Sequence, residues 1–174
     1  MKLLKGYLAT HFFNDSGFKW THELAKTIRE SASIDLYVPQ ENSEINDKSG
    51  DDSNITAVAI ANGDNKYLRE ANVLIASLDG VEIDSGVSAE IGYFSGLIES
   101  ERRLVAQPRT RYIIGLYTDI RRDGSGDNHY YINLYTKGLV QLYGTVVHNN
   151  DELKSVLRGI QSKIRIENQI RGKI

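Results

Sequence analysis

The sequence contains no cysteine and no long apolar run, and these absences exclude several classes of protein. Without cysteine the chain can form no disulfide, no thiolate metal site and no cysteine nucleophile. No apolar run reaches transmembrane length, and the N-terminus lacks the apolar core and small-residue cleavage site of a signal peptide, so we expect a cytoplasmic protein without a membrane partner. The four histidines show no metal-ligand spacing, so no metal site is expected.

The chain also has no large excess of charge of either sign. The net charge is −2 over 174 residues, and lysine and arginine are scattered along the chain. This argues against a nucleic-acid partner held mainly by charge. The chain has two prolines, no linker rich in proline or serine and no internal repeat. We therefore expect one domain over residues 1–174, long enough to bury a core.

What the sequence does contain is an alternation of strand-like and helix-like segments. Apolar runs typical of strands lie at residues 3–10, 34–39, 73–79, 111–119 and 145–149. Amphipathic helical patterns separate them, and a last one covers 151–169, with Asp151 suited to cap it. This alternation predicts an α/β fold: a flavodoxin-like, doubly wound parallel sheet of five strands in the order 2-1-3-4-5, with helices on both faces.

Three segments between the strands carry turn signals. The helical pattern over residues 55–72 is expected to break near Asn62 and Gly63. Residues 40–54 and 121–130 are polar and are predicted to be loops. The second of these has glycines but lacks the Lys-Ser/Thr of a phosphate-binding loop, so we interpret it as a surface loop or lid.

The predicted topology indicates where a ligand would bind. In such a sheet the crevice lies at the carboxyl ends of the strands where the winding reverses, here between the first and third strands. The strand ends and loops that meet there carry Tyr7, Phe12, Phe13, Asp79, Asp84 and Glu90. These residues are therefore candidates for a common site.

Glu90 is the candidate with the clearest spacing. It shares a helix face with Phe94 and Leu97, at i, i+4 and i+7. Because Phe94 and Leu97 are expected to face the sheet or a subunit contact, Glu90 is expected to point into the crevice. The alternative is an acid near a helix N-terminus, stabilised by roughly 0.3–1 kcal/mol through the helix dipole.

Two aspartates extend the possible chemistry. Asp84 lies six residues before Glu90, where the helix should begin. Two carboxylates at one crevice can act together as in retaining glycoside cleavage. One attacks a sugar carbon as the nucleophile, and the other donates a proton to the leaving group or removes one from it. Asp64 is a candidate third polar group, and Phe12 and Phe13 are candidates to stack on a flat base. Helix caps and turns for the aspartates, and core packing for the phenylalanines, are the structural alternatives.

Four further segments are distinctive together: GYLAT (6–10), ANVLIASLDG (71–80), DSGVSAEIGYFSG (84–96) and INLYTKGL (132–139). The third contains the pattern D-x-G-x-x-x-E-[IV]-G. In order and spacing these segments resemble the nucleoside 2-deoxyribosyltransferase family, over roughly residues 3–148. The resemblance implies a flavodoxin-like fold, transfer of 2-deoxyribose between nucleobases, a role in nucleotide salvage, and no metal or organic cofactor.

The resemblance also implies roles for single residues. Glu90 matches the nucleophilic glutamate, and Tyr7 matches a tyrosine that orients it. Asp84 matches an aspartate that contacts the base or assists its protonation, and Asp64 matches another base-side aspartate. Asn133 matches an asparagine that a neighbouring subunit contributes to the 5′-hydroxyl of the sugar, so a homo-oligomer built from dimers, such as a hexamer, is implied.

Departures from the family pattern bear on the choice of base. The chain has Thr-His-Phe-Phe at residues 10–13 where many members have Gly-Pro or a similar pair, and Tyr135 where some members have a methionine two residues after the asparagine; both lie near the predicted base or sugar pocket. The implied substrates are 2′-deoxynucleosides and free nucleobases. Two other functions stay open: an N-glycosidase that hydrolyses nucleosides or nucleoside 5′-monophosphates, and a non-catalytic nucleotide-binding module.

Overall fold

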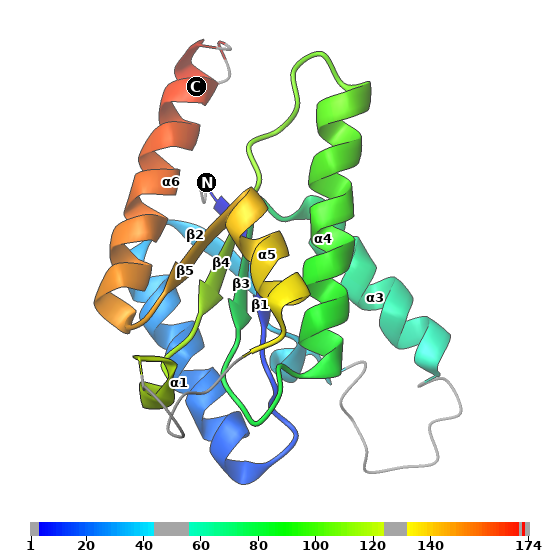
Figure 1. Ribbon diagram of the computed structural model, residues 1–174. Helices are drawn as coiled ribbons and strands as arrows, with labels where there is room; N and C mark the ends of the chain where they lie inside the picture. The colour runs from blue at the N-terminus through cyan, green and yellow to red at the C-terminus, as the bar shows by residue number, and fades with distance from the viewer. Residues whose placement is uncertain (1–3, 44–55, 124–131, 171, 173–174) are drawn as a thin grey trace.

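The computed structural model describes residues 4–43, 56–123, 132–170 and 172. Its centre is a sheet of five parallel strands in the order β2-β1-β3-β4-β5 (Figure 1). The strands are β1 (Leu4–Ala9), β2 (Ile34–Tyr37), β3 (Val73–Ser77), β4 (Tyr112–Leu116) and β5 (Gly144–Val147). The predicted flavodoxin-like fold and its strand order are thus confirmed.

Helices cover both faces of this sheet (Figure 1). On one face lie α1 (Asp15–Ser31) and α6 (Asn150–Ile170), which contact each other. On the other lie α3 (Ala57–Glu70), α4 (Ser85–Leu104) and α5 (Leu134–Tyr143). Short 3₁₀ turns, η1 (Pro39–Glu41) and η2 (Ile120–Asp123), follow β2 and β4. Beyond these turns the two predicted loops lie largely outside the described residues.

The core consists of two apolar layers, one on each side of the sheet. Leu8, Ile28 and Leu157 belong to the layer under α1 and α6, and Leu74 and Phe94 belong to the layer under α3, α4 and α5. Every residue of β3 is buried, as expected for a central parallel strand covered on both faces. In the part of the chain that the structure describes, no helix is both long and apolar enough to cross a bilayer.

Side-chain caps set the starts of α1, α3, α4 and α5. The capping residues are Asn14 for α1, Thr56 for α3, Asp84 for α4 and Asn133 for α5. Each accepts a hydrogen bond from a backbone amide in the first turn, which would otherwise lack a partner within the helix. Two of these caps, Asp84 and Asn133, are also candidate site residues.

The expected break in the helix at Asn62 and Gly63 is wrong, because α3 runs unbroken through both residues. A glycine inside a helix costs only about 1 kcal/mol relative to alanine. Tertiary contacts outweigh that cost: Leu68 is buried against the second apolar layer, and the end of α3 is tied to the strand that follows α4. Asp64 therefore lies within a continuous helix and not at a helix start.

The last helix is capped by Asn149, so the expectation that Asp151 caps it is wrong. Oδ1 of Asn149 accepts from the backbone amides of Asp151 at 3.1 Å and Glu152 at 2.9 Å. Glu152 in turn accepts from the backbone amide of His148 and from the side-chain amide of Asn149, each at 2.8 Å. Because the Asn149 side chain already accepts from these amides, Asp151 does not cap the helix; it projects outward and pairs with Lys154 at 3.4 Å.

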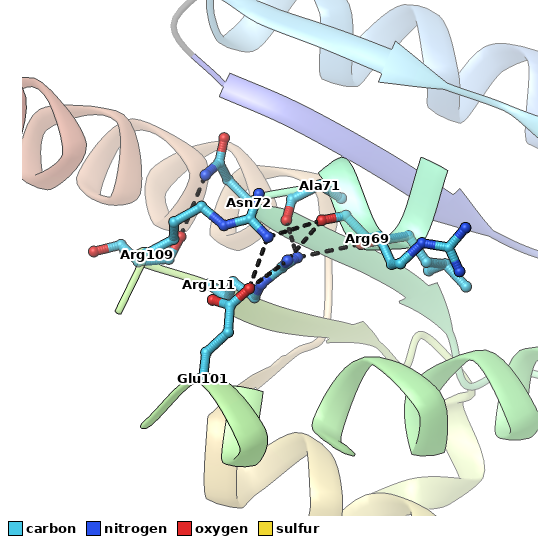
Figure 2. Close-up of polar contacts among 8 residues, drawn as sticks. Arg69, Ala71, Asn72, Glu101, Arg109 and Arg111 are labelled. Atoms are coloured by element: carbon cyan, nitrogen blue, oxygen red, sulfur yellow. Dashed lines mark hydrogen bonds and ion pairs between the residues drawn. The ribbon is translucent and has the colours of Figure 1, made fainter. Parts of the chain in front are cut away.

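Arg111, directly before β4, joins the end of α3 to α4 (Figure 2). Its guanidinium donates to the backbone oxygens of Leu68, Arg69 and Ala71. It also pairs with Glu101 of α4 at 2.9 Å, and its side chain is 1% exposed. These contacts satisfy carbonyls at the C-terminus of α3 and fix the positions of two helices relative to each other. Asp64 and Glu90 lie on those same helices.

Candidate active site

A pocket of about 240 Å³ opens at the carboxyl edge of the sheet, beside the ends of β1 and β2 and the start of α4. Five of the residues predicted from the sequence line it: Phe12, Phe13, Asp64, Asp84 and Glu90. The winding of the sheet reverses between β1 and β3, so the pocket lies where a doubly wound sheet is expected to bind its ligand. Three carboxyl groups thus share the wall of a small, partly apolar pocket.

Glu90 lies in the second turn of α4, where its carboxylate accepts a hydrogen bond from the hydroxyl of Tyr7. Tyr7 is on β1 and is fully buried. On the same helix, Ile91 and Phe94 are fully buried in the apolar layer under α4. These two side chains hold α4 against the sheet, so Glu90 meets the end of β1 instead of turning into water.

The electrostatics of this pair follow from its burial. Burial is the main cause that raises the pKa of Glu90 to about 7; the hydrogen bond from Tyr7 opposes the rise, and the charges of Asp64 and Asp84 add to it. Burial, with the neighbouring charge of Glu90, raises the pKa of Tyr7 far above its ordinary value. Tyr7 therefore remains a hydrogen-bond donor, while Glu90 is poised between its two protonation states near neutral pH.

Asp84 caps α4 and lines the pocket as well. Its Oδ1 accepts from the backbone amides of Gly86 at 2.8 Å and Val87 at 3.1 Å. The cap and the site were alternative interpretations of this residue, and the structure combines them. Because both cap bonds use Oδ1, they fix the orientation of the carboxylate without using Oδ2.

Asp64 reaches the pocket from α3 and contacts a residue that the sequence had not suggested. Its Oδ1 accepts a hydrogen bond from the hydroxyl of Tyr37 at 3.3 Å, and Asn42 donates to that hydroxyl at 3.0 Å. Burial raises the pKa of Asp64, and hydrogen bonds from Tyr37 and Tyr7 lower it. The sequence carried no local signal for this contact; it follows from the pairing of β2 with β1, which places Tyr37 beside Tyr7.

Phe12 and Phe13 follow β1 and stack on each other, with ring centroids 4.7 Å apart. Phe12 is half-buried and Phe13 is 72% exposed, and neither is among the buried core residues. Both line the pocket. The position suits contact with a flat ligand better than the alternative of core packing.

Three other candidates lie away from this pocket. Asn133 is exposed and accepts a hydrogen bond from the backbone amide of Thr136 at 3.0 Å, and Tyr135 is 77% exposed. Neither lines the pocket of its own chain. Asp79 instead accepts from the backbone amide of Thr118 at 2.7 Å and lines a second pocket, of about 320 Å³, beside α1. The topology therefore does not bring Asp79 to Glu90 as expected.

The described residues include no group of three or more histidine, aspartate or glutamate side chains arranged to hold a metal ion. The carboxylates of the pocket are held instead by tyrosine hydroxyls and backbone amides. This arrangement suits an uncharged or weakly charged ligand that offers hydrogen-bonding edges and a flat face. It also places an ionisable carboxylate next to the bound ligand.

Comparison with known proteins identifies similar chains. A family model described as nucleoside 2-deoxyribosyltransferase matches residues 7–155. Among solved structures, a conserved protein from Enterococcus faecalis V583 is 31% identical, with a TM-score of 0.74 over 90% of this chain and 98% of that chain. A 2-deoxyribosyltransferase from Bacillus psychrosaccharolyticus is 16% identical, with a TM-score of 0.61 over 86% and 90%, a likeness in fold alone. No curated protein matches the sequence of this chain.

Proposed function

This chain belongs to the nucleoside 2-deoxyribosyltransferase family, and from that premise we propose that it exchanges the nucleobase of a 2′-deoxynucleoside for another by double displacement. The observation that carries the proposal is the contact between Tyr7 and the half-buried Glu90 in a pocket shared with two further carboxyl groups. Removing the Glu90 carboxylate from water costs free energy, and simple binding of a nucleotide would not require an acid at that position. A nucleophile needs that position.

In the first half of the reaction, the ionised Glu90 attacks C1′ of the deoxynucleoside. The bond between C1′ and the base nitrogen breaks, and its electron pair leaves with the base. A proton delivered to the base from Asp84 or Asp64 makes it a better leaving group. Tyr7 keeps its own proton and orients the attacking oxygen.

In the second half, a nitrogen of an incoming base attacks C1′ of the deoxyribosyl ester on Glu90. The ester bond breaks, Glu90 is regenerated as a carboxylate, and the proton that the incoming nitrogen loses returns to the aspartate. Kinetics of the ping-pong type follow, because the first base leaves before the second enters. A 2′-hydroxyl on the sugar would crowd Glu90 and withdraw electron density from C1′, so deoxyribose is the expected sugar.

The proposal is tested by incubating the protein with 2′-deoxyinosine and adenine and separating the products by chromatography. New 2′-deoxyadenosine is expected. Hypoxanthine with free deoxyribose, and no new nucleoside, would instead assign the chain as a hydrolase. No reaction with any deoxynucleoside or deoxynucleotide, from folded protein, would favour a binding module.

The role of Glu90 has a matched control on the same helix. Glu90→Ala is expected to lower the rate of transfer by at least about a thousandfold, because no other group occupies the position of attack. Glu99→Ala removes a largely exposed acid from α4 and is expected to leave the rate unchanged. Full activity in folded Glu90→Ala would show that another residue is the nucleophile.

A further inference from the structure

Asp64 is positioned by Tyr37, and Tyr37 is positioned in turn by Asn42; neither of these two residues lines the pocket. Tyr37, at the end of β2, donates its hydroxyl hydrogen to Oδ1 of Asp64 at 3.3 Å. Asn42, just after η1, donates its side-chain amide to the same hydroxyl oxygen at 3.0 Å. The three side chains form a chain of hydrogen bonds that ends at the pocket.

The ring of Tyr37 is fixed on two sides. It stacks on Tyr67 with centroids 3.6 Å apart and an interplanar angle of 11°. It also packs at a tilt against Tyr7, with centroids 5.3 Å apart. Because Tyr67 and Asp64 both lie on α3, the stacking partner and the hydrogen-bond partner of Tyr37 belong to the same helix. The hydroxyl is therefore held at one position relative to Asp64.

The direction of these hydrogen bonds decides where Asp64 can carry a proton. An ionised carboxylate can only accept, so the single hydroxyl hydrogen of Tyr37 is directed to Asp64 while the Tyr37 oxygen accepts from Asn42. Oδ1 of Asp64 is then an acceptor. While Tyr37 donates to Oδ1, a proton bound by Asp64 is carried on Oδ2.

We propose that Tyr37, supported by Asn42, is a positioning residue of the transfer reaction: it holds Oδ1 of Asp64 so that a proton on Oδ2 is presented to the departing nucleobase. The inference rests on the proposed function, because it assigns a task within that reaction. It also assigns Asp64 the delivery of the proton. Asp84, whose Oδ1 is used for the cap of α4, is left to contact the base.

The groups that face Asp64 come from three other elements. Tyr7 on β1, Tyr37 on β2 and Glu90 on α4 face it, and Lys66 and Tyr67 are its neighbours along α3, where they contact each other. Burial raises the pKa of Asp64, and the hydrogen bonds from Tyr37 and Tyr7 lower it. Loss of the Tyr37 hydroxyl therefore moves the pKa of Asp64 further upward.

The test compares Tyr37→Phe with Tyr112→Phe in the full chain. Tyr112 is another half-buried tyrosine, on β4, with no place in the site. Tyr37→Phe is expected to lower kcat for 2′-deoxyinosine by about ten- to a hundredfold, the loss typical of one hydrogen bond to a charged group, while KM changes little. The loss should be much smaller with 7-methyl-2′-deoxyguanosine, whose base leaves without needing a proton.

A second measurement does not depend on turnover. Titration of the Asp64 carboxyl carbon by ¹³C NMR, without substrate, should give a higher pKa in Tyr37→Phe than in the wild type and no change in Tyr112→Phe. Asn42→Ala preserves the tyrosine stack and should change both readouts in the same direction by a smaller amount. It therefore serves as the test if Tyr37→Phe fails to fold.

The outcomes separate this inference from the function on which it rests. If the wild type transfers no deoxyribose, the proposed function fails and the inference falls with it. If the wild type is active and Tyr37→Phe matches Tyr112→Phe in kcat and in the Asp64 titration, the inference alone is wrong. An equal loss with both nucleosides would also overturn it, because the defect would not concern the proton.

Discussion

At the scale of single residues, the site depends on acids held where water would normally solvate them. Glu90 is half-buried, close to Asp64 and Asp84, and its pKa is raised mainly by burial. Such an arrangement is unfavourable for stability, and it is typical of functional sites. The hydrogen bond from Tyr7 offsets part of the free energy that burial of the Glu90 carboxylate costs.

The pH dependence of the reaction should follow from Glu90. The group must be ionised to attack, and its pKa is about 7, so kcat/KM should fall as the pH decreases below about 7. In Tyr7→Phe the hydrogen bond that lowers this pKa is lost, so the acidic limb should move to higher pH. Profiles of kcat/KM from pH 5 to 9 measure this. A limb that moves to lower pH in the variant would contradict the assignment.

At the scale of elements, the helices of the site are positioned far from the pocket as well as within it. Arg111 connects the C-terminus of α3, Glu101 on α4 and the start of β4 (Figure 2). Its guanidinium also lies 5.3 Å from the ring centre of Phe94, one turn after Glu90 on α4. The buried Arg111 thus contacts both α3, which carries Asp64, and α4, which carries Glu90.

Replacing this cation should cost much more than replacing its neighbour. Arg111→Met leaves several carbonyls and a partly buried Glu101 without the guanidinium, so we expect a loss of about 3 kcal/mol in the free energy of unfolding. Arg109 also pairs with Glu101, at 2.7 Å, but its side chain is 50% exposed. Arg109→Met should cost less than about 1 kcal/mol. Urea denaturation of both variants measures the difference, and equal losses would contradict a special role for Arg111.

At the scale of the whole molecule, one chain does not gather every residue that the family resemblance implies. Asn133 begins α5 on the surface, and the exposed apolar side chains of Leu134, Tyr135 and Leu142 lie on the same helix. Exposed apolar groups gathered on one element favour a contact with another chain. We expect that contact to be a second copy, with Asn133 completing the neighbouring site.

Mixing inactive variants tests this expectation. Glu90→Ala and Asn133→Ala should each be inactive, but refolding them together creates sites that combine an intact Glu90 with the intact Asn133 of a neighbour. About a quarter of the wild-type activity should return in a symmetric dimer. Glu90→Ala mixed with Asp84→Ala is the control and should show no more activity than the two variants measured separately, because both residues belong to the same chain's pocket. If the variants do form mixed oligomers and the first mixture recovers no activity, Asn133 does not complete a neighbouring chain's site.

The sequence by itself determined the strands, their parallel pairing and the acids that line the pocket, whereas the strand order 2-1-3-4-5 was an expectation from the flavodoxin-like fold that the structure confirmed. Buried strands are continuous apolar runs, and alternation with helices requires parallel pairing, so these features are local or follow from simple connection rules. The spacing of Glu90 and Phe94 fixed which way the acid points, and it faces the pocket as predicted. Asp84 could be placed for the same reason, since a helix start has a local signature.

The tertiary structure decided what depends on partners distant in the chain. Whether α3 breaks at Gly63 depends on Leu68 and on the distant Arg111, which hold the helix together. The capping of α6 was settled by which of two nearby side chains reaches the amides, a matter of backbone direction. Tyr37 meets Asp64 only because β2 pairs beside β1 while α3 packs above them. A contact between residues far apart in sequence leaves no local pattern, because packing and not chain spacing brings its atoms together.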